Sequence, residues 1–177
     1  MSIKDSLLRN MLHDLTVCQQ LHAKLDKKNV DWRPAENMRP TIHLMQYLTF
    51  IGGSTVKHFV NPTADRAAAV GPIMEASKNS SAVTFDSFPE AIEREKHEIA
   101  KLLENVTEED LLNKKTYAPW GGPDITLYDA LDGITMRYLT AYRHQLFLYA
   151  KMCGADINTG DNWRGRGAAI AAEHGKS

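Results

Sequence analysis

The sequence predicts an all-α protein, a four-helix bundle with a long crossover between its second and third helices. Three observations predict this fold class. Apolar residues recur at alternating spacings of three and four over four long segments, which is the pattern of helices that bury one face. No segment shows the convincing apolar and polar alternation of a half-buried strand. The middle connection is long enough for the helices on either side of it to lie parallel.

The first two helices are expected at residues 4–27 and 41–59, on either side of a connection that closes at Pro40. The apolar stripe of the first helix is Leu8, Met11, Leu15, Cys18, Leu21 or His22, and Leu25. The second helix starts beside Pro40, because proline is well tolerated in the first helical turn. Its glycine pair, Gly52 and Gly53, weakens the helix and predicts a bend or the close approach of a neighbouring element.

The connection at residues 61–84 is rich in Ala, Pro, Gly and Ser, and we expect it to form a loop with one helical turn near residues 65–70. The third helix is expected at residues 87–105. Its start combines Ser87 as the capping residue, a proline early in the helix and Glu90 at the position that completes a capping box.

The fourth helix is expected at residues 126–153, after a short extra turn at residues 107–112. Thr126 is expected to cap it, with Asp129 at its third position. One face is aromatic and hydroxylated where a purely structural helix would favour leucine. This face consists of Leu127, Leu131, Ile134, Tyr138, Ala141 or Tyr142, Leu148 or Tyr149, and Met152, with Gln145 as its polar member. Bundles build ligand and metal sites from inward side chains, so this face is the candidate functional site.

The composition indicates one globular domain. The chain has 177 residues, a hydrophobic fraction of 43% and a charged fraction of 24%, which suffices for a sizeable core. We expect the bundle to occupy residues 1–154. A Gly-rich, partly ordered tail is expected at residues 155–177, with Trp163 as its anchor.

The net charge and the cysteines indicate which partners and which cellular compartment to expect. A net charge of −1 provides no electrostatic footprint for nucleic acid or an anionic membrane. The first residues lack the apolar core of a signal peptide, and no apolar run approaches membrane-spanning length. Cys18 and Cys153 do not make a disulfide framework, so we expect both to be reduced in a cytoplasmic protein.

Three motifs together resemble the DinB/YfiT-like family of bacterial four-helix-bundle proteins, many of which bind a metal. The first is an arginine that opens the second helix after a Pro-rich loop, at residues 32–39 (WRPAENMR). The second is an aromatic and glycine loop that leads into a capped Leu-Tyr helix start, at residues 120–131 (WGGPDITLYDAL). The third is Arg-x-Gln-Leu at residues 143–146, followed by Gly154. The resemblance covers residues 4–154.

The resemblance implies a divalent metal held by three histidines, one on the second helix and a pair four residues apart on the fourth. At the matching positions this sequence has Tyr47, Tyr138 and Tyr142. His43, one turn before Tyr47, is the histidine that could replace it if the register of the second helix differs. A phenol must lose a proton with a pKa of about 10 to ligate well, whereas neutral imidazole binds readily at pH 7. We therefore predict no cofactor here; if any binds, it is a divalent metal such as Zn, Ni or Fe.

Two interpretations of the altered position remain open. Tyr47, Tyr138, Tyr142, His43 and Gln145 could satisfy one another as a polar plug, since buried phenols usually find hydrogen-bond partners. Alternatively, the same residues could line a pocket that binds a small molecule, because aromatic walls with a few polar groups are typical of such pockets.

The resemblance implies a function only in outline. We expect a DinB-like protein of unassigned activity, metal-free, that acts as a binding or structural protein. The alternative is a metal-dependent hydrolase or thiol transferase with a non-standard ligand set, and a third possibility is a dimerisation or stress-response module without a ligand. No catalytic residue is assigned. The resemblance also implies a homodimer.

Overall fold

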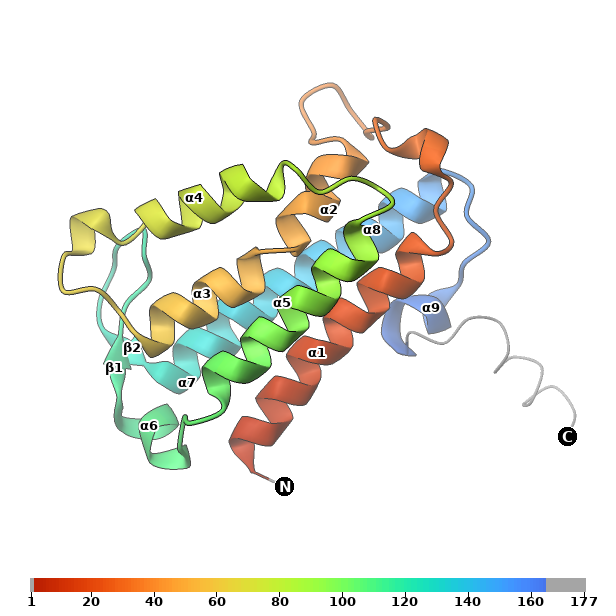
Figure 1. The fold of residues 1–177 in the computed structure, drawn as a ribbon. Coiled ribbons are helices and arrows are strands. Elements are labelled where there is room, and N and C mark those ends of the chain that lie inside the picture. Colours follow the sequence, from red (N-terminus) through yellow and green to blue (C-terminus); the bar gives the residue numbers. More distant parts are fainter. Residues whose placement is uncertain (1, 165–177) are drawn as a thin grey trace, which may run out of the picture.

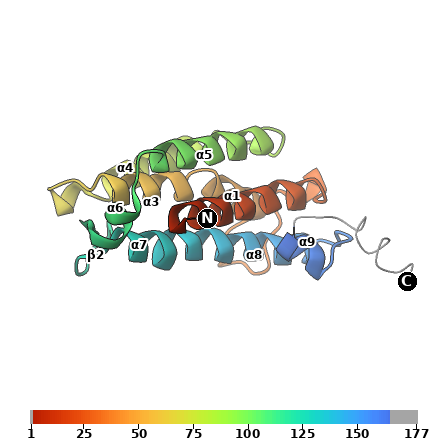
Figure 2. The same ribbon diagram turned by 90° about the horizontal axis from the view of Figure 1, so that it is seen from below.

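The structure, a computed structural model that describes residues 2–164, is built from long helices that lie side by side (Figure 1). These are α1 (Ile3–His22), α2 (Thr41–Leu48) with α3 (Ile51–Val60), α5 (Phe88–Leu103) and α8 (Arg137–Met152). Helix α1 lies between α5 and α8, as Figure 2 shows, and α3 packs on α5. The all-α class predicted from the sequence is confirmed.

The remaining elements connect or flank these helices. They are η1 (Lys27–Asn29), η2 (Arg66–Ala68), α4 (Gly71–Ser80), α6 (Glu108–Asn113), β1 (Lys115–Thr116), β2 (Ile125–Thr126), α7 (Leu127–Ala130), the π-helical segment η3 (Leu131–Met136) and α9 (Thr159–Arg164). Strands β1 and β2 pair antiparallel at the entry to the last long helix. That helix runs without a gap through α7, η3 and α8.

Helix α1 is shorter than expected. It begins with a capping box between Ser2 and Asp5 and ends at His22 instead of near residue 27. The cause is local, because the Asp26 carboxylate accepts a hydrogen bond from the backbone N–H of Lys28 and starts the separate turn η1. Side chains of this kind compete with a helix for the backbone groups at its end.

The second long helix is broken, as the glycine pair predicted. Helix α2 ends before Thr49 and Phe50, and α3 begins directly after them. The Glu95 carboxylate of α5 accepts a hydrogen bond from the N–H of Gly53 at 2.6 Å. A Cβ atom on Gly53 would lie 2.8 Å from Glu95 Oε2, and one on Gly52 would lie 2.9 Å from a side-chain carbon of α5. The close approach of a neighbouring helix is therefore present.

The crossover contains a helix that the composition did not predict. The turn expected near residues 65–70 is η2, but α4 then continues for ten residues. Helix α4 packs on α2 and α3. Only Ile73, Ala76 and Ser80 on it are half-buried or buried, and three residues are too few to give a recognisable apolar stripe. Helix α4 therefore owes its place mainly to tertiary packing.

The cap predictions at the later helices had mixed outcomes. Ser87 does not cap α5, because its backbone is already helical and its hydroxyl accepts instead from the N–H of Thr84. Thr107 and Asp110 form a complete capping box at the short helix α6. Thr126 caps the last long helix through the N–H of Asp129, as predicted.

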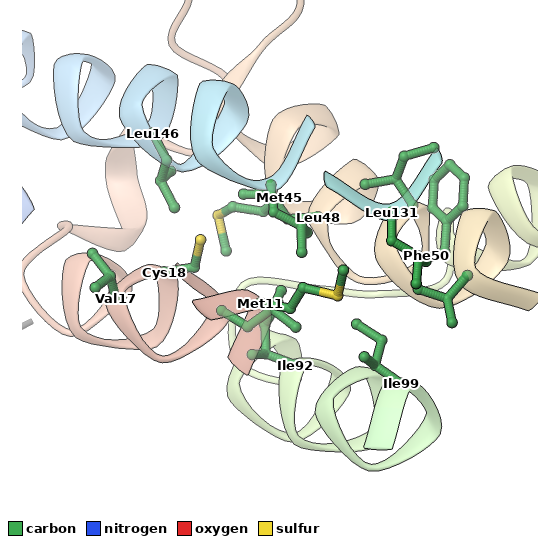
Figure 3. Close-up of a cluster of buried hydrophobic side chains, with 14 of the residues drawn as sticks. Met11, Val17, Cys18, Met45, Leu48, Phe50, Ile92, Ile99, Leu131 and Leu146 are labelled. Carbon is green, nitrogen blue, oxygen red and sulfur yellow. The ribbon is translucent and has the colours of Figure 1, made fainter. Parts of the chain in front are cut away.

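The core fills the space between the long helices (Figure 3). Its labelled members are Met11, Val17, Cys18, Met45, Leu48, Phe50, Ile92, Ile99, Leu131 and Leu146, and all are buried. Both cysteines are free, and Cys18 is one of these core residues. No helix within residues 2–164 is long and apolar enough to cross a membrane.

The end of the described chain folds back onto the bundle. Helix α9 packs against α1 and α8. The carbonyl oxygen of Trp163, the expected anchor, is 2.8 Å from His13 Nε2 on α1. The tail was expected at residues 155–177, and residues 165–177 of that range lie outside the described residues.

Candidate functional site

Four aromatic side chains form a row across the expected site, which we call the aromatic row: Tyr47, Tyr142, Tyr138 and Trp120. The ring centroids of Tyr47 and Tyr142 are 4.6 Å apart, those of Tyr142 and Tyr138 are 6.2 Å apart, and those of Tyr138 and Trp120 are 5.9 Å apart. Tyr47 lies in the last turn of α2, directly before the break. Tyr138 and Tyr142 are one turn apart on α8, and Trp120 lies in the β1–β2 loop. The structure thus brings together the three tyrosines selected from the sequence.

Arg39 supplies a positive charge at one end of the aromatic row. Its guanidinium carbon lies 4.8 Å from the ring centroid of Tyr47 and 5.2 Å from that of Tyr142. Both distances are within the range of a cation–π interaction. Within residues 2–164, no Asp or Glu forms a salt bridge with Arg39. The aromatic row therefore contacts a half-buried cation that has no carboxylate partner in the described chain.

The backbone of Arg39 is held by a chain of hydrogen bonds from α8. The amide of Gln145 donates to the hydroxyl of Tyr149 at 3.0 Å, and that hydroxyl donates to the Arg39 carbonyl oxygen at 3.1 Å. The ring of Trp32 meets the buried Tyr149 ring edge-on at 5.4 Å. Gln145 therefore acts on the site through Tyr149 and Arg39, and its amide does not donate to the tyrosines of the aromatic row.

His43 stays outside the site. It lies one turn before Tyr47 on α2, but its side chain is exposed. Among residues 2–164, no ring contact or hydrogen bond joins it to the aromatic row. Its place in the expected group is therefore not supported by a contact, although the helical spacing that suggested it is correct.

Burial keeps the phenols of Tyr47 and Tyr138 protonated. It is the main cause that raises the pKa of Tyr47 above its usual value, and the neighbouring Tyr142 and Tyr138 raise that pKa further. The positive charge of Arg39 acts in the opposite direction but is the smallest of these causes. Burial, and after it Tyr142, also raise the pKa of Tyr138. At neutral pH both hydroxyls therefore keep their protons and can donate hydrogen bonds.

The donor set does not fit the divalent metal that the family resemblance implies. Tyr47, Tyr138 and Tyr142 would each have to ionise, although burial disfavours the phenolate of the first two. Arg39 also places a fixed positive charge against two of the rings, which repels a second cation. Within residues 2–164, no three His, Cys, Asp or Glu side chains gather where they could hold one ion.

Two members of the site were not selected from the sequence. Arg39 was recognised as part of a motif, but its contact with the aromatic rings depends on how the loop before α2 packs against α8. Trp120 was likewise noted only for its loop. The shared signal is that both residues belong to the motifs that carried the family resemblance, and that signal could have added them to the candidate set.

Arg143, the first residue of the Arg-x-Gln-Leu motif, has a separate structural role. It is 2% exposed, and its Nε lies 2.9 Å from Asp14 Oδ1 on α1. The hydroxyl of Thr140 donates to the same carboxylate at 2.6 Å. Arg143 also donates to Asn162 and lies 5.0 Å from the Trp163 ring centroid, measured from its guanidinium carbon. The motif arginine thus joins α8 to α1 and α9.

The fold and the site define a helical-bundle protein with a row of tyrosines and an arginine between its second and last long helices. The structure is similar to the crystal structure, at 2.30 Å resolution, of YjoA, a DinB-like protein from Bacillus subtilis. The TM-score is 0.65 at 16% identity, and the similarity covers 86% of this chain and 94% of that chain. Searches with family models and among curated proteins find no match. The resemblance to DinB-like proteins is therefore confirmed at the level of the fold.

Proposed function

We propose that this chain is a metal-independent DinB-like protein that binds a small molecule at the aromatic row. One observation carries the proposal. Arg39 lies against Tyr47 and Tyr142, where the family resemblance puts a metal ligand set, and it has no carboxylate partner within residues 2–164. A half-buried cation without a counter-charge is costly unless something else offsets it. The ring faces offset part of that cost, and a bound ligand would offset more.

The free energy of ionising the phenols supports metal independence. Lowering the pKa of one phenol from about 10 to below 7 requires roughly 4 kcal/mol of additional anion stabilisation. Burial moves the pKa of Tyr47 and Tyr138 in the opposite direction, so the requirement is larger at those two residues. A divalent ion would also have to approach the guanidinium of Arg39. Neutral phenols beside a cation are therefore the more stable arrangement.

The exposure of the aromatic row supports a binding role over a buried plug. Tyr47, Tyr138 and Tyr142 are each half-buried, and Trp120 is 54% exposed. Ligands can therefore reach these rings from solvent. Gln145, which the plug would require, is engaged with Tyr149 instead. An accessible aromatic wall with a few polar groups is typical of a small-molecule site.

A nuclear magnetic resonance titration of the full chain with small aromatic fragments tests the proposal. We expect fragment-induced shifts to centre on the signals of Tyr138, Tyr142 and the Trp120 indole. Tyr142→Leu should remove these shifts, whereas Tyr128→Leu, on α7 outside the aromatic row, should keep them. Shifts confined to other parts of the protein would contradict the proposal.

The metal-dependent hydrolase or thiol transferase remains the alternative. It requires one divalent ion per chain, which metal analysis of protein purified without an affinity tag would detect. No residue of the aromatic row is assigned a catalytic role.

A homodimer and a cytoplasmic location belong to the proposal as well. The dimer is expected from the family resemblance, and sedimentation showing a single species of 19.8 kDa at micromolar concentration would argue against it. The two free cysteines are compatible with a reducing compartment.

A further inference from the structure

We propose that the ligand of the aromatic row is an aromatic carboxylate, with its carboxylate on Arg39 and its ring on the faces of Tyr138 and Trp120. This inference rests on the proposed function and specifies the chemical class of the ligand. It follows from three properties of the site: an unpaired guanidinium, phenols that keep their protons and can donate a hydrogen bond, and an exposed ring at the far end of the row.

Arg39 carries the first step. A guanidinium has five N–H donors in a planar fork and no acceptor. Within residues 2–164, no carboxylate pairs with Arg39, and no hydrogen bond from its guanidinium is found. Its backbone is fixed by Tyr149, and its side chain rests against Tyr47 and Tyr142. The fork is therefore held in place with its donors unused, which favours an anion as the ligand.

The phenols point to the same class of ligand. Tyr47 and Tyr138 keep their protons at neutral pH because burial raises the pKa of both. Each hydroxyl can therefore donate a hydrogen bond to an anionic oxygen. Among the described residues, no acidic side chain makes a hydrogen bond or salt bridge with any member of the aromatic row or with Arg39. The site offers donors and one positive charge, so it is complementary to an acceptor-rich ligand.

The charge count selects a monoanion. One guanidinium balances one negative charge, and its planar fork matches the two coplanar oxygens of a carboxylate. A phosphate dianion would require a second cation beside Arg39. His43 on α2 is exposed and does not contact the row. A carboxylate therefore fits the site better than a phosphate.

The far end of the row indicates what the carboxylate is attached to. Trp120 is 54% exposed, and its ring centroid lies 5.9 Å from that of Tyr138. Exposed tryptophan faces bind planar apolar groups, because they add stacking to the burial of apolar area. The row continues from Tyr138 to Tyr142, whose ring centroids are 6.2 Å apart, and from the Tyr142 centroid to the Arg39 guanidinium carbon at 5.2 Å. A ring joined to a carboxylate would thus meet complementary groups at both ends.

The experiment is a titration of the full chain with four probes. Binding is monitored through the nuclear magnetic resonance signals of Tyr138, Tyr142 and the Trp120 indole. Benzoate carries both the ring and the charge, benzyl alcohol carries only the ring, acetate carries only the charge, and inorganic phosphate has a higher charge without a ring. We expect benzoate to bind at least about tenfold more tightly than each of the other three, as the loss of a charge-assisted hydrogen bond predicts.

Variants of Arg39 test whether the affinity for benzoate depends on its guanidinium. Arg39→Gln should weaken benzoate about tenfold or more and leave benzyl alcohol unchanged. Arg39→Lys keeps the charge but loses the fork, so its loss should be smaller. Arg33→Gln is the matched control, because Arg33 lies in the same loop, is exposed and bonds only to the Glu36 carbonyl oxygen among the described residues. Circular dichroism of each variant checks that the helices are retained.

The outcomes separate the two proposals. If benzyl alcohol binds the row as tightly as benzoate, in the wild type and in Arg39→Gln alike, the carboxylate is wrong and the small-molecule site stands. If phosphate binds more tightly than benzoate and depends on Arg39, the anion is right but the aromatic carboxylate is overturned. If no probe shifts the signals of the row, both proposals are wrong. The wild-type comparison of probes remains decisive even if an Arg39 variant fails to fold.

Discussion

The Glu95 carboxylate accepts a hydrogen bond at 2.6 Å from the backbone N–H of Gly53, a residue 42 positions earlier in the chain. Glu95 is only 6% exposed. The free N–H groups at the start of a helix normally need a local cap, and at α3 the carboxylate of another helix takes this role. Because Tyr47 lies in the last turn of α2, directly before the break that precedes α3, the same contact helps to define where the aromatic row begins.

Gly53→Ala should destabilise the fold by about 1–3 kcal/mol, as overpacking of a buried site does. The added Cβ would lie 2.8 Å from Glu95 Oε2, so the buried carboxylate would have to move away from its N–H donor. Urea unfolding measures the change. Gly71→Ala is the control, since a Cβ there meets nothing within 4 Å. Equal effects of the two substitutions would contradict the close approach.

The stability of the protein should fall as the pH rises from about 4.5 to about 7. Burial is the main cause that raises the pKa of Glu95 from 4.5 to about 7, against the hydrogen bonds from Gly53 and Gly52, and Glu98 adds to the rise. In this pH range the folded state binds a proton that the unfolded state has released, so folding is favoured at the acid end. The contribution is about 3 kcal/mol, fully present below pH 4.5 and lost by about pH 7.

Glu95→Gln tests this pH dependence because it removes the titration and keeps an oxygen acceptor for Gly53. Urea unfolding between pH 4.5 and 8 should show a flatter profile for this variant than for the wild type. Glu104→Gln is the control, because Glu104 is exposed directly after α5, and this variant should keep the wild-type slope. A wild-type slope in Glu95→Gln would show that another group is responsible.

Arg143→Met should lower the free energy of unfolding by about 3–5 kcal/mol, because it leaves the buried Asp14 carboxylate without its partner. Thermal unfolding measures the loss. The exposed Arg137→Met at the start of the same helix is the matched control and should change stability little. The double variant Asp14→Leu with Arg143→Met should recover much of the loss, since it removes both buried charges. A double variant no more stable than Arg143→Met would contradict this account of the pair.

Tyr149→Phe should weaken both stability and ligand binding. It removes the hydroxyl that accepts from Gln145 and donates to the Arg39 carbonyl oxygen. The expected loss in unfolding free energy is about 1–3 kcal/mol, as for other buried groups left without a partner. Benzoate affinity should fall with it, because Arg39 loses its anchor. Tyr128→Phe is the control and should leave the benzoate affinity unchanged. If Tyr149→Phe also leaves it unchanged, Arg39 is positioned by its ring contacts alone.

The sequence predicted those parts of the fold that depend on local signals. The cap of Thr126 and the capping box of Thr107 involve residues three apart, so the pattern was visible without tertiary contacts. Ser87 shows the limit of such patterns, because its hydroxyl found a partner in Thr84 outside the helix. The position of the helix break depends on Glu95 from another helix, so the glycine pair could indicate a bend but not its cause.

The candidate site followed the same division. The helical period placed Tyr138 and Tyr142 on one face, and in the structure the Tyr142 ring contacts Tyr47 while the Tyr138 ring contacts Tyr142. The same period suggested His43 as a member of the site, but its side chain is exposed and does not contact the aromatic row. The contact of Arg39 with the rings requires the loop before α2 to pack against α8, and no local pattern encodes that packing.

Equilibrium dialysis of tag-free protein against Zn²⁺, Ni²⁺ and Fe²⁺ at pH 7 tests the central claim most directly. The claim is that Arg39 and neutral tyrosines replace a metal centre. We predict that no ion is retained at the aromatic row in stoichiometric amount, and that Tyr142→Phe retains the same amount as the wild type. One ion per chain in the wild type, lost in Tyr142→Phe, would contradict the claim and favour the metal-dependent alternative.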